Sequence, residues 1–238
     1  MKQLLVLCLM LTMNLSAERV YATFDIQAYK EANLAFSAGG IIKEIHTDIS
    51  MQVKKGDILA VLDSEELTAK LEIAQIAMQH AKQEYERQLY IKRVIQQSKL
   101  DLYKFQYDNA KAQVKYIQSL LDKTILKAPF DGLISAKMIE VGDVVSGMAP
   151  RTAFILQSEH KRKLILQFDQ KYWKKVQTGN TFEYTIDGDD TVHRGVITKI
   201  YPDTNTKNRK MTAEVYATDF IIGLFGTGHI ITQDEESK

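Results

Sequence analysis

The hydrophobic residues of the chain follow two different periods, and the change of period divides the sequence into three parts. From residue 64 to residue 124 they recur at alternating spacings of three and four, the heptad pattern of helices that pack together. On either side they alternate, or form short β-branched runs between turn-forming residues, which predicts strands. The pattern predicts a mixed α and β protein in which two β regions flank a helical one.

The helical stretch predicts two helices. Gly and Pro are absent from Asp63 to Ala128, and the series of apolar residues breaks between Gln88 and Leu100. We therefore expect an antiparallel coiled-coil hairpin with its tip near residues 94–98. The expected seam residues are Leu67, Leu71, Ala74, Met78, Ala81 and Tyr85 on the first helix, and Leu100, Tyr103, Tyr107, Ala110, Val114, Ile117 and Leu121 on the second.

The ends and the outer surface of the hairpin carry further signals. Asp63 with Glu66 predicts a capping box at the first helix start, and Ser98 with Asp101 predicts one at the second. Several apolar residues lie off the seam, which favours side-by-side packing with other copies over an isolated coiled-coil spacer. They are Ile73, Ile76, Leu89, Tyr90, Ile91, Leu102 and Tyr116.

A weak internal repeat flanks the hairpin. Residues 40–53 align without gaps with residues 132–145, which lie 92 positions later, and each copy combines β-branched residues with Gly-Asp turns. Neither copy is large enough to make a core alone, so we expect two similar four-stranded halves that face each other.

Strand patterns return from Leu164 onward and predict a small antiparallel barrel. The predicted strands are residues 164–168, 181–186, 195–201, 211–217 and 229–232. The predicted turns are Asp187-Gly188, Pro202-Asp203 and Gly226-Thr227-Gly228.

The N-terminus reads as a secretory signal. An apolar run from Leu4 to Leu11 follows Lys2, and cleavage is expected after Ala17 or Ala22, with an uncleaved anchor as the alternative. Cys8 is the only cysteine, and large apolar residues precede it where a lipoprotein signal needs small ones, so we expect no lipidation. The protein is therefore expected in the periplasm.

Charge and motif content exclude several function classes. Thirty-one basic residues balance 30 acidic ones, which disfavours a nucleic-acid partner. The five histidines are scattered, and no phosphate loop, nucleophile elbow or carboxylate pair is present, so we expect no metal, no cofactor and no enzyme activity.

Three segments carry a resemblance to a known family. Residues 53–59 (VKKGDIL), 126–134 (LKAPFDGLI) and 141–145 (VGDVV), with the hairpin between them, resemble the periplasmic adaptor (membrane fusion protein, HlyD/AcrA-like) family of tripartite efflux systems. Ser50 departs from the family, which usually has Gly there, whereas its counterpart Gly142 keeps the glycine.

The resemblance implies an elongated fold: a split biotinyl/lipoyl-like β domain interrupted by the hairpin, then a β-barrel, with the membrane-proximal domain absent or reduced. The expected divisions are a signal peptide (1–22), an N-terminal strand with the first lipoyl half (23–63), the hairpin (64–124), the second lipoyl half (125–157), the barrel (158–232) and a polar tail (233–238).

The resemblance also implies a tip for docking on a TolC-like outer-membrane channel. Arg87, Ile91 and Ser98 fall at the spacings of the family's docking pattern, with Ile in place of Leu. The other implied partners are further copies of the chain, as a trimer or hexamer, and an inner-membrane transporter.

For that transporter, a resistance-nodulation-division (RND) pump for small toxic compounds is favoured over an ABC-type exporter or a type I secretion system. A lipoyl or biotin carrier subunit, outside the family, is disfavoured because carriers place their modified Lys on a tight turn where this chain has the hairpin.

Overall fold

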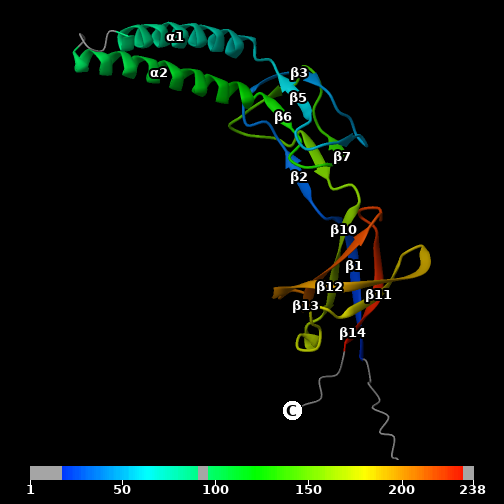
Figure 1. The fold of residues 1–238 in the computed structure, drawn as a ribbon. Helices are drawn as coiled ribbons and strands as arrows, with labels where there is room; N and C mark the ends of the chain where they lie inside the picture. Colours follow the sequence, from blue (N-terminus) through cyan, green and yellow to red (C-terminus); the bar gives the residue numbers. More distant parts are fainter. Residues whose placement is uncertain (1–17, 91–95, 233–238) are drawn as a thin grey trace, which may run out of the picture. The chain divides into compact units, whose positions relative to one another are not determined.

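The computed structural model describes residues 18–90 and 96–232, which belong to two compact units (Figure 1). One unit is a closed barrel made by the N-terminal strand and the part of the chain that begins at His160. The other unit, residues 31–159, holds two four-stranded sheets and the helical hairpin.

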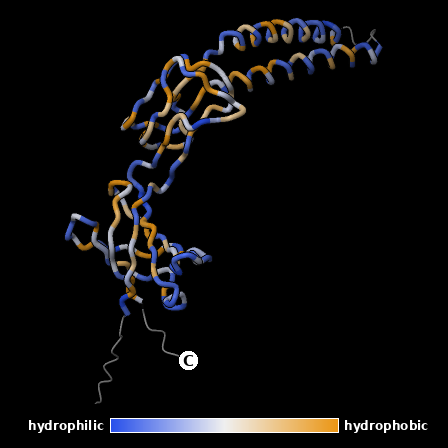
Figure 2. Tube along the Cα trace, turned by 180° about the vertical axis from the view of Figure 1, so that it is seen from behind, coloured by the Kyte–Doolittle hydropathy of each residue, from blue (hydrophilic) through white to orange (hydrophobic). Residues whose placement is uncertain are grey.

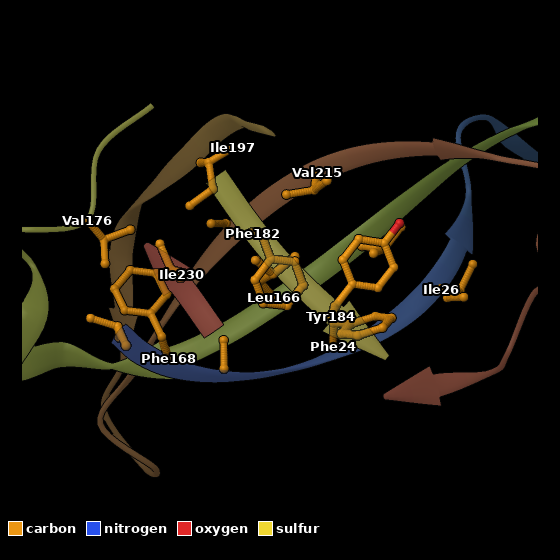
Figure 3. Packing of buried hydrophobic residues seen from close by; sticks show 14 of the residues in the cluster. Phe24, Ile26, Leu166, Phe168, Val176, Phe182, Tyr184, Ile197, Val215 and Ile230 are labelled. Atoms are coloured by element: carbon orange, nitrogen blue, oxygen red, sulfur yellow. The ribbon is translucent and has the colours of Figure 1, made fainter. Parts of the chain in front are cut away.

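The barrel is antiparallel, with strand order β1-β10-β13-β12-β11-β14. Its interior is filled by alternating apolar residues, and the ring of Phe24 lies edge-on to those of Phe182 and Tyr184, with centroids 5.7 and 5.2 Å apart (Figure 3). The strands are β1 (Glu18–Ala28), β10 (Lys161–Asp169), β11 (Thr181–Ile186), β12 (Asp189–Asn205), β13 (Lys210–Thr218) and β14 (Phe225–Thr232).

The expected division 23–63 groups an N-terminal strand with the first lipoyl half, whereas in the structure that strand belongs to the barrel unit. The strand is β1, which closes the barrel by pairing with β10 on one side and β14 on the other. Val20 and Ala22 are fully buried in the barrel core. Cleavage after Ala22 would remove both from the core, whereas cleavage after Ala17 would leave β1 whole.

Two of the expected barrel turns are strand residues instead. Pro202-Asp203 lies inside β12, beside an irregularity in its pairing with β13. Gly226 and Gly228 lie inside β14, where an added Cβ would come within 2.2 Å of Thr185 O and 2.3 Å of Glu183 O. These two glycines give the neighbouring backbone and the core rings room, and they do not turn the chain.

The second unit contains two sheets, and each combines strands from both copies of the repeat. One sheet has the order β2-β9-β7-β4, and the other β6-β5-β3-β8. The strands are β2 (Glu31–Leu34), β3 (Gly40–Ile45), β4 (Gln52–Val53), β5 (Ile58–Leu62), β6 (Ile125–Lys127), β7 (Gly132–Lys137), β8 (Val144–Val145) and β9 (Phe154–Gln157). The expected separate halves are thus interleaved, which buries one apolar face of each sheet in a shared core.

The repeat reappears as a reciprocal exchange of hydrogen bonds. Ile42 N donates to Asp143 O at 2.9 Å, and Ile134 N, 92 residues after Ile42, donates to Met51 O at 3.0 Å. Likewise Gly142 N donates to Ile42 O and Ser50 N to Ile134 O, at 2.9 and 2.8 Å. The second strand of each copy therefore pairs with the first strand of the other.

The two copies differ at the turn before that second strand. Ser50 and Gly142 occupy equivalent positions with φ angles of 66° and 94°, in the left-handed region. Glycine adopts this conformation without steric cost, whereas a residue with a Cβ is strained there.

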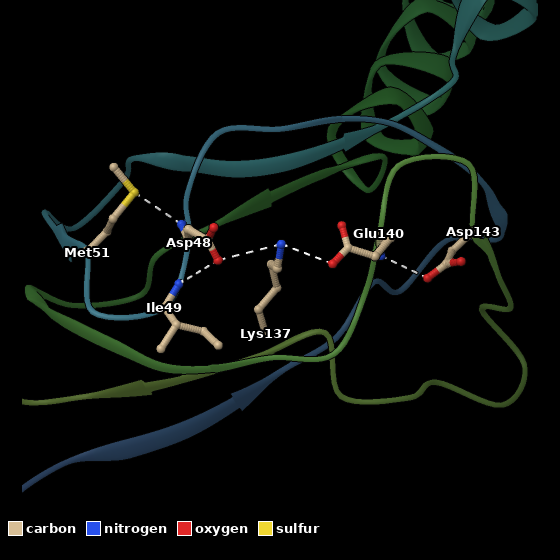
Figure 4. Close-up of polar contacts among 6 residues, drawn as sticks. All are labelled: Asp48, Ile49, Met51, Lys137, Glu140 and Asp143. Carbon is tan, nitrogen blue, oxygen red and sulfur yellow. Dashed lines mark hydrogen bonds and ion pairs between the residues drawn. The ribbon is translucent and has the colours of Figure 1, made fainter.

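A lysine links the two turns of this domain. Lys137 Nζ lies 3.5 Å from Asp48 Oδ1 and 3.1 Å from Glu140 Oε1 (Figure 4). The Glu140 carboxylate, with a smaller effect from Asp48, raises the pKa of Lys137. The Ile49 N–H and Lys137 lower the pKa of Asp48. The carboxylates are exposed, so the pairs order the turns and add little stability.

The hairpin grows directly from two paired strands. α1 (Glu65–Tyr90) follows β5 and α2 (Gln97–Asp122) precedes β6, with Asp63-Ser64 and Lys123-Thr124 as the links. β5 pairs with β6, and Leu62 N donates to Thr124 O at 2.9 Å at the base of the hairpin. The direction of both helices is therefore set by the sheet.

One buried carboxylate lies in the barrel wall. Glu214 is 3% exposed. It accepts a hydrogen bond from Tyr201 Oη at 2.6 Å and forms an ion pair with Lys199 Nζ at 3.3 Å. Although burial opposes ionisation, these two partners lower the pKa of Glu214. The same hydrogen bond raises the pKa of Tyr201 to about 12.

Ser50→Gly is expected to raise the free energy of unfolding of the second unit by about 1 kcal/mol, because it removes the strain of a Cβ in the left-handed region. Gly142→Ser is the matched control and is expected to lower it by a similar amount, since an added Cβ there meets no neighbour and only the backbone strain remains. Urea unfolding followed by circular dichroism measures both, and equal stability of the two variants would contradict the assignment.

Glu214→Gln is expected to flatten the acid limb of barrel stability. The folded carboxyl has a pKa below its ordinary 4.5, so its contribution is complete above pH 4.5 and is lost as the pH falls through the folded value. Thermal unfolding followed by the fluorescence of Trp173, the only tryptophan, measures this. The exposed carboxylate Asp190, changed to Asn, is the control that should keep the wild-type pH dependence.

Candidate partner-docking surfaces of the helical hairpin

The helical hairpin is held together by its heptad seam, as the sequence predicts. Every predicted seam residue is buried or half-buried, and Leu71, Ala74 and Ile117 form a small core with Val114 and Leu121. Hydrophobic residues recur along the whole length of both helices (Figure 2). Seam residues account for only part of them.

Aromatic packing continues the seam toward the tip. The rings of Tyr85 and Tyr107 stack with centroids 6.2 Å apart and planes 14° apart, and Leu100 is 5% exposed. The two helices are therefore held together close to the tip, where Tyr85 lies two residues before Arg87.

Arg87 and Ser98 lie at the same end of the hairpin, since α1 ends where α2 begins. Arg87 belongs to the last turn of α1, its side chain is 67% exposed, and its Nη1 lies 3.1 Å from Glu84 Oε1. Ile91, the third predicted docking residue, lies outside the described residues.

The predicted capping role of Ser98 is wrong. The N-cap of α2 is Gln96, in an extended conformation and without a side-chain cap, because the helix begins two residues earlier than a capping box at Ser98 requires. Asp101 instead accepts a hydrogen bond from Gln97 Nε2 at 2.8 Å. Ser98 is exposed, and its hydroxyl has no hydrogen-bond partner among residues 18–90 and 96–232.

At the other end of the hairpin, Asp63 caps the first turn of α1, but the predicted capping box with Glu66 does not form. Asp63 Oδ1 accepts a hydrogen bond from Glu65 N at 3.1 Å. Glu66 pairs with Lys70 at 2.5 Å, one turn along the helix, instead of reaching back to the cap. A cleft of about 640 Å³ lies at this base, lined in part by Ala38, Ile41 and Leu67.

The off-seam apolar residues that the structure describes are exposed, as the sequence analysis expects. Ile73 and Ile76 are 68% and 62% exposed and are neighbours on the surface of α1. Sequence reasoning missed Phe105, which is 68% exposed and lies three residues from the exposed Leu102. The same criterion, an apolar residue off the seam, identifies it. The remaining exposed members of this surface are Leu89, Tyr90 and Tyr116.

Neither a metal-binding cluster nor a membrane-spanning helix is found among the described residues. No group of three or more His, Cys, Asp or Glu side chains within them could hold a metal ion. Neither of the described helices is long and apolar enough to cross a membrane. The hairpin presents an exposed cation, an exposed hydroxyl and exposed apolar side chains, which suit contacts with other proteins.

Comparison with known proteins decides the family. The model of the CzcB-like barrel-sandwich hybrid domain matches residues 30–154, more than half of the chain. The chain belongs to the periplasmic adaptor, or membrane fusion protein, family. The matched range covers most of the interleaved sheets and the whole hairpin.

Two curated relatives of this adaptor cover about half of it. An uncharacterised protein of Haemophilus influenzae is 27% identical over 117 residues, which are 48% of this chain and 31% of the relative. The cobalt-zinc-cadmium resistance protein CzcB of Cupriavidus metallidurans is 26% identical over 137 residues, which are 50% of this chain and 26% of the relative. The match thus spans less than a third of the length of either relative.

A solved structure shares the fold over nearly the whole adaptor. The MacA–MexA chimeric protein, which contains the α-hairpin domain of Pseudomonas aeruginosa MexA, superimposes with a TM-score of 0.86 at 22% identity. The superposition covers 92% of this chain and 81% of the chimera. The barrel, the interleaved sheets and the hairpin therefore occur together in a known adaptor fold.

Proposed function

We propose that this adaptor links an inner-membrane transporter to a TolC-like outer-membrane channel, and that the hairpin tip at Arg87, Ile91 and Ser98 docks on the channel. The observation that carries the proposal is the exposure of a cation on the last turn of α1 and of a hydroxyl on the first turn of α2, at the same end of a packed hairpin. Both residues belong to the pattern that the family resemblance implies for docking. Ile91 joins them on sequence spacing alone.

The local structure supports a contact role for Arg87 and Ser98 over a role in folding. The pair between Arg87 and Glu84 is an exposed i,i+3 pair, which adds at most about 0.5 kcal/mol to helix stability. Ser98 caps nothing. Side chains that contribute little to the fold are free to be matched to a partner.

Self-association is the second part of the proposal. The exposed apolar residues on both helices would be covered if hairpins packed side by side in a trimer or hexamer. Such a ring brings several tips together and presents Arg87 and Ser98 repeatedly to the open end of a channel.

The transported compounds and the transporter complete the proposal. We place the chain with a resistance-nodulation-division pump for small toxic compounds, because of its short hairpin and overall pattern. An ABC-type exporter or type I secretion system is the alternative. Co-purification of the tagged adaptor with the transporter encoded beside its gene distinguishes the two.

Arg87→Asp is expected to reduce cell survival to that of a strain lacking the gene, in the presence of a compound to which that strain is sensitive, because it reverses the charge at the docking tip. Lys70→Asp, the same change at the base of α1, is the control and should keep survival. Circular dichroism should be unchanged in both variants, and wild-type survival with Arg87→Asp would exclude a docking role for this residue.

Ile73→Ser with Ile76→Ser is expected to remove the trimer or hexamer that chemical cross-linking traps in the periplasm, because it makes the outer surface of α1 polar. The control pair, Val192→Ser with Ile221→Ser, changes barrel residues that are 63% and 71% exposed, and should leave cross-linking intact. A monomeric pattern in the wild type, or loss of cross-linking in the control alone, would contradict side-by-side packing of hairpins.

A further inference from the structure

One end of the barrel carries a cluster of cations around an exposed tryptophan. A short 3₁₀ turn (η1, Gln170–Tyr172) follows β10, and after it come Trp173, Lys174 and Lys175. Trp173 is the only tryptophan of the chain. It is 61% exposed, although tryptophan has the largest side chain of all residues. The turn and the residues that follow it are named here the Trp173 loop (170–176).

The Trp173 loop is firmly anchored, so the exposure of its tryptophan is a fixed feature. Val176 is 2% exposed and projects into the barrel core (Figure 3). Tyr172 packs against the same core. Asp169 Oδ1 accepts a hydrogen bond from Lys171 N at 2.9 Å, and Trp173 N donates to Gln170 O at 3.0 Å. The buried Val176 and the half-buried Tyr172 therefore hold the loop, while Trp173 and its neighbouring lysines are exposed.

A second cationic segment lies next to the loop. The connection between β12 and β13 carries Lys207 and Arg209, and Lys210 is the first residue of β13. Gln170 N donates to Arg209 O at 3.1 Å, and Asp169 and Lys210 are paired across β10 and β13. The two segments together form one surface, the basic barrel end.

The basic barrel end has an excess of positive charge that the rest of the chain lacks. Six cations and three carboxylates lie in its two segments and on the strand ends beside them, which leaves a local excess of three positive charges, whereas the whole chain carries +1. The cations are Lys171, Lys174, Lys175, Lys207, Arg209 and Lys210, and the carboxylates are Glu18, Asp169 and Asp203. Within residues 18–90 and 96–232, Lys171 and Lys174 form no ion pair and lie instead over aromatic rings, 4.9 Å from the centroid of Tyr172 and 5.2 Å from that of Trp173.

An ion pair shows at which end of the barrel the Trp173 loop lies. Lys175 Nζ lies 2.5 Å from Glu18 Oε2, and Glu18 is paired with Thr232. The basic barrel end is therefore the end at which β1 begins and β14 ends (Figure 1).

From these contacts we infer that the basic barrel end docks on the surface of a membrane that contains anionic phospholipids. Tryptophan with its apolar ring and polar N–H is favoured at the level of lipid headgroups, and lysine side chains extend their charges from apolar stems to the same level. Each Lys or Arg near an anionic lipid surface adds to the attraction. The charge sign, the exposed indole and the rigid anchoring of the loop all fit this one occupant.

The test uses the full chain, the fluorescence of its single tryptophan, and vesicles of phosphatidylcholine alone or mixed with phosphatidylglycerol. The emission of Trp173 is expected to shift to the blue with the mixed vesicles only, and co-sedimentation should decline as salt is raised to about 0.5 M. The apolar run Leu4–Leu11 would favour both vesicle types equally. No blue shift, or an equal shift with both compositions, would overturn the inference in favour of an acidic protein surface.

Matched variants locate the interaction. Lys171→Glu with Lys174→Glu should lower the partition onto mixed vesicles about 25-fold or more, since removal of each charge costs about fivefold. Lys111→Glu with Lys115→Glu makes the same change in net charge on α2 and should keep wild-type binding. An equal loss in both pairs would sink the proposal. No channel or transporter is present in this experiment, so its outcome is independent of the tip docking proposed above.

Discussion

The pairing of β5 with β6 is the constraint on which the hairpin depends. Two residues separate each of these strands from its helix, so the sheet sets where both helices begin and how they are directed. Each helix has 26 residues, which gives a length of about 39 Å at about 1.5 Å per residue. Over that length, a small change of angle at the base would displace the tip by several ångströms. The hydrogen bonds at Leu62 and Thr124 and the buried seam both limit that change.

The hairpin was the part of the fold that the sequence predicted best, because its signal is local. Heptad spacing depends only on which residues share a helix face, and the seam residues from Leu67 to Leu121 are all at least half-buried. The error at Ser98 has a local cause as well. A capping box is recognised by residue type, whereas the helix begins where the backbone leaves the extended conformation, and here that residue is Gln96.

The barrel was predicted less well because its closure is non-local. The alternation of Val20, Ala22 and Phe24 is strand-like, but nothing in a single strand shows that its partners lie about 140 and 210 residues away. The role of glycine, in a turn or inside a strand, was ambiguous for a related reason. Gly226 and Gly228 look like turn residues in sequence, whereas the close approach of β11 and the ring of Phe182 explains them in the structure. The tip residues could be proposed only from the resemblance, and Ile91 lies outside the described residues.

The two proposed contact surfaces share a physical design although their chemistry differs. Near the hairpin tip, the stacked Tyr85 and Tyr107 hold together the two helices that expose Arg87 and Ser98. At the barrel end, the buried Val176 fixes the loop that exposes Trp173. In each case buried apolar contacts order the backbone during folding, so less conformational entropy is lost when a partner binds. A surface that is ordered before binding can be small and still bind its partner, which suits a protein whose function depends on holding other components in place.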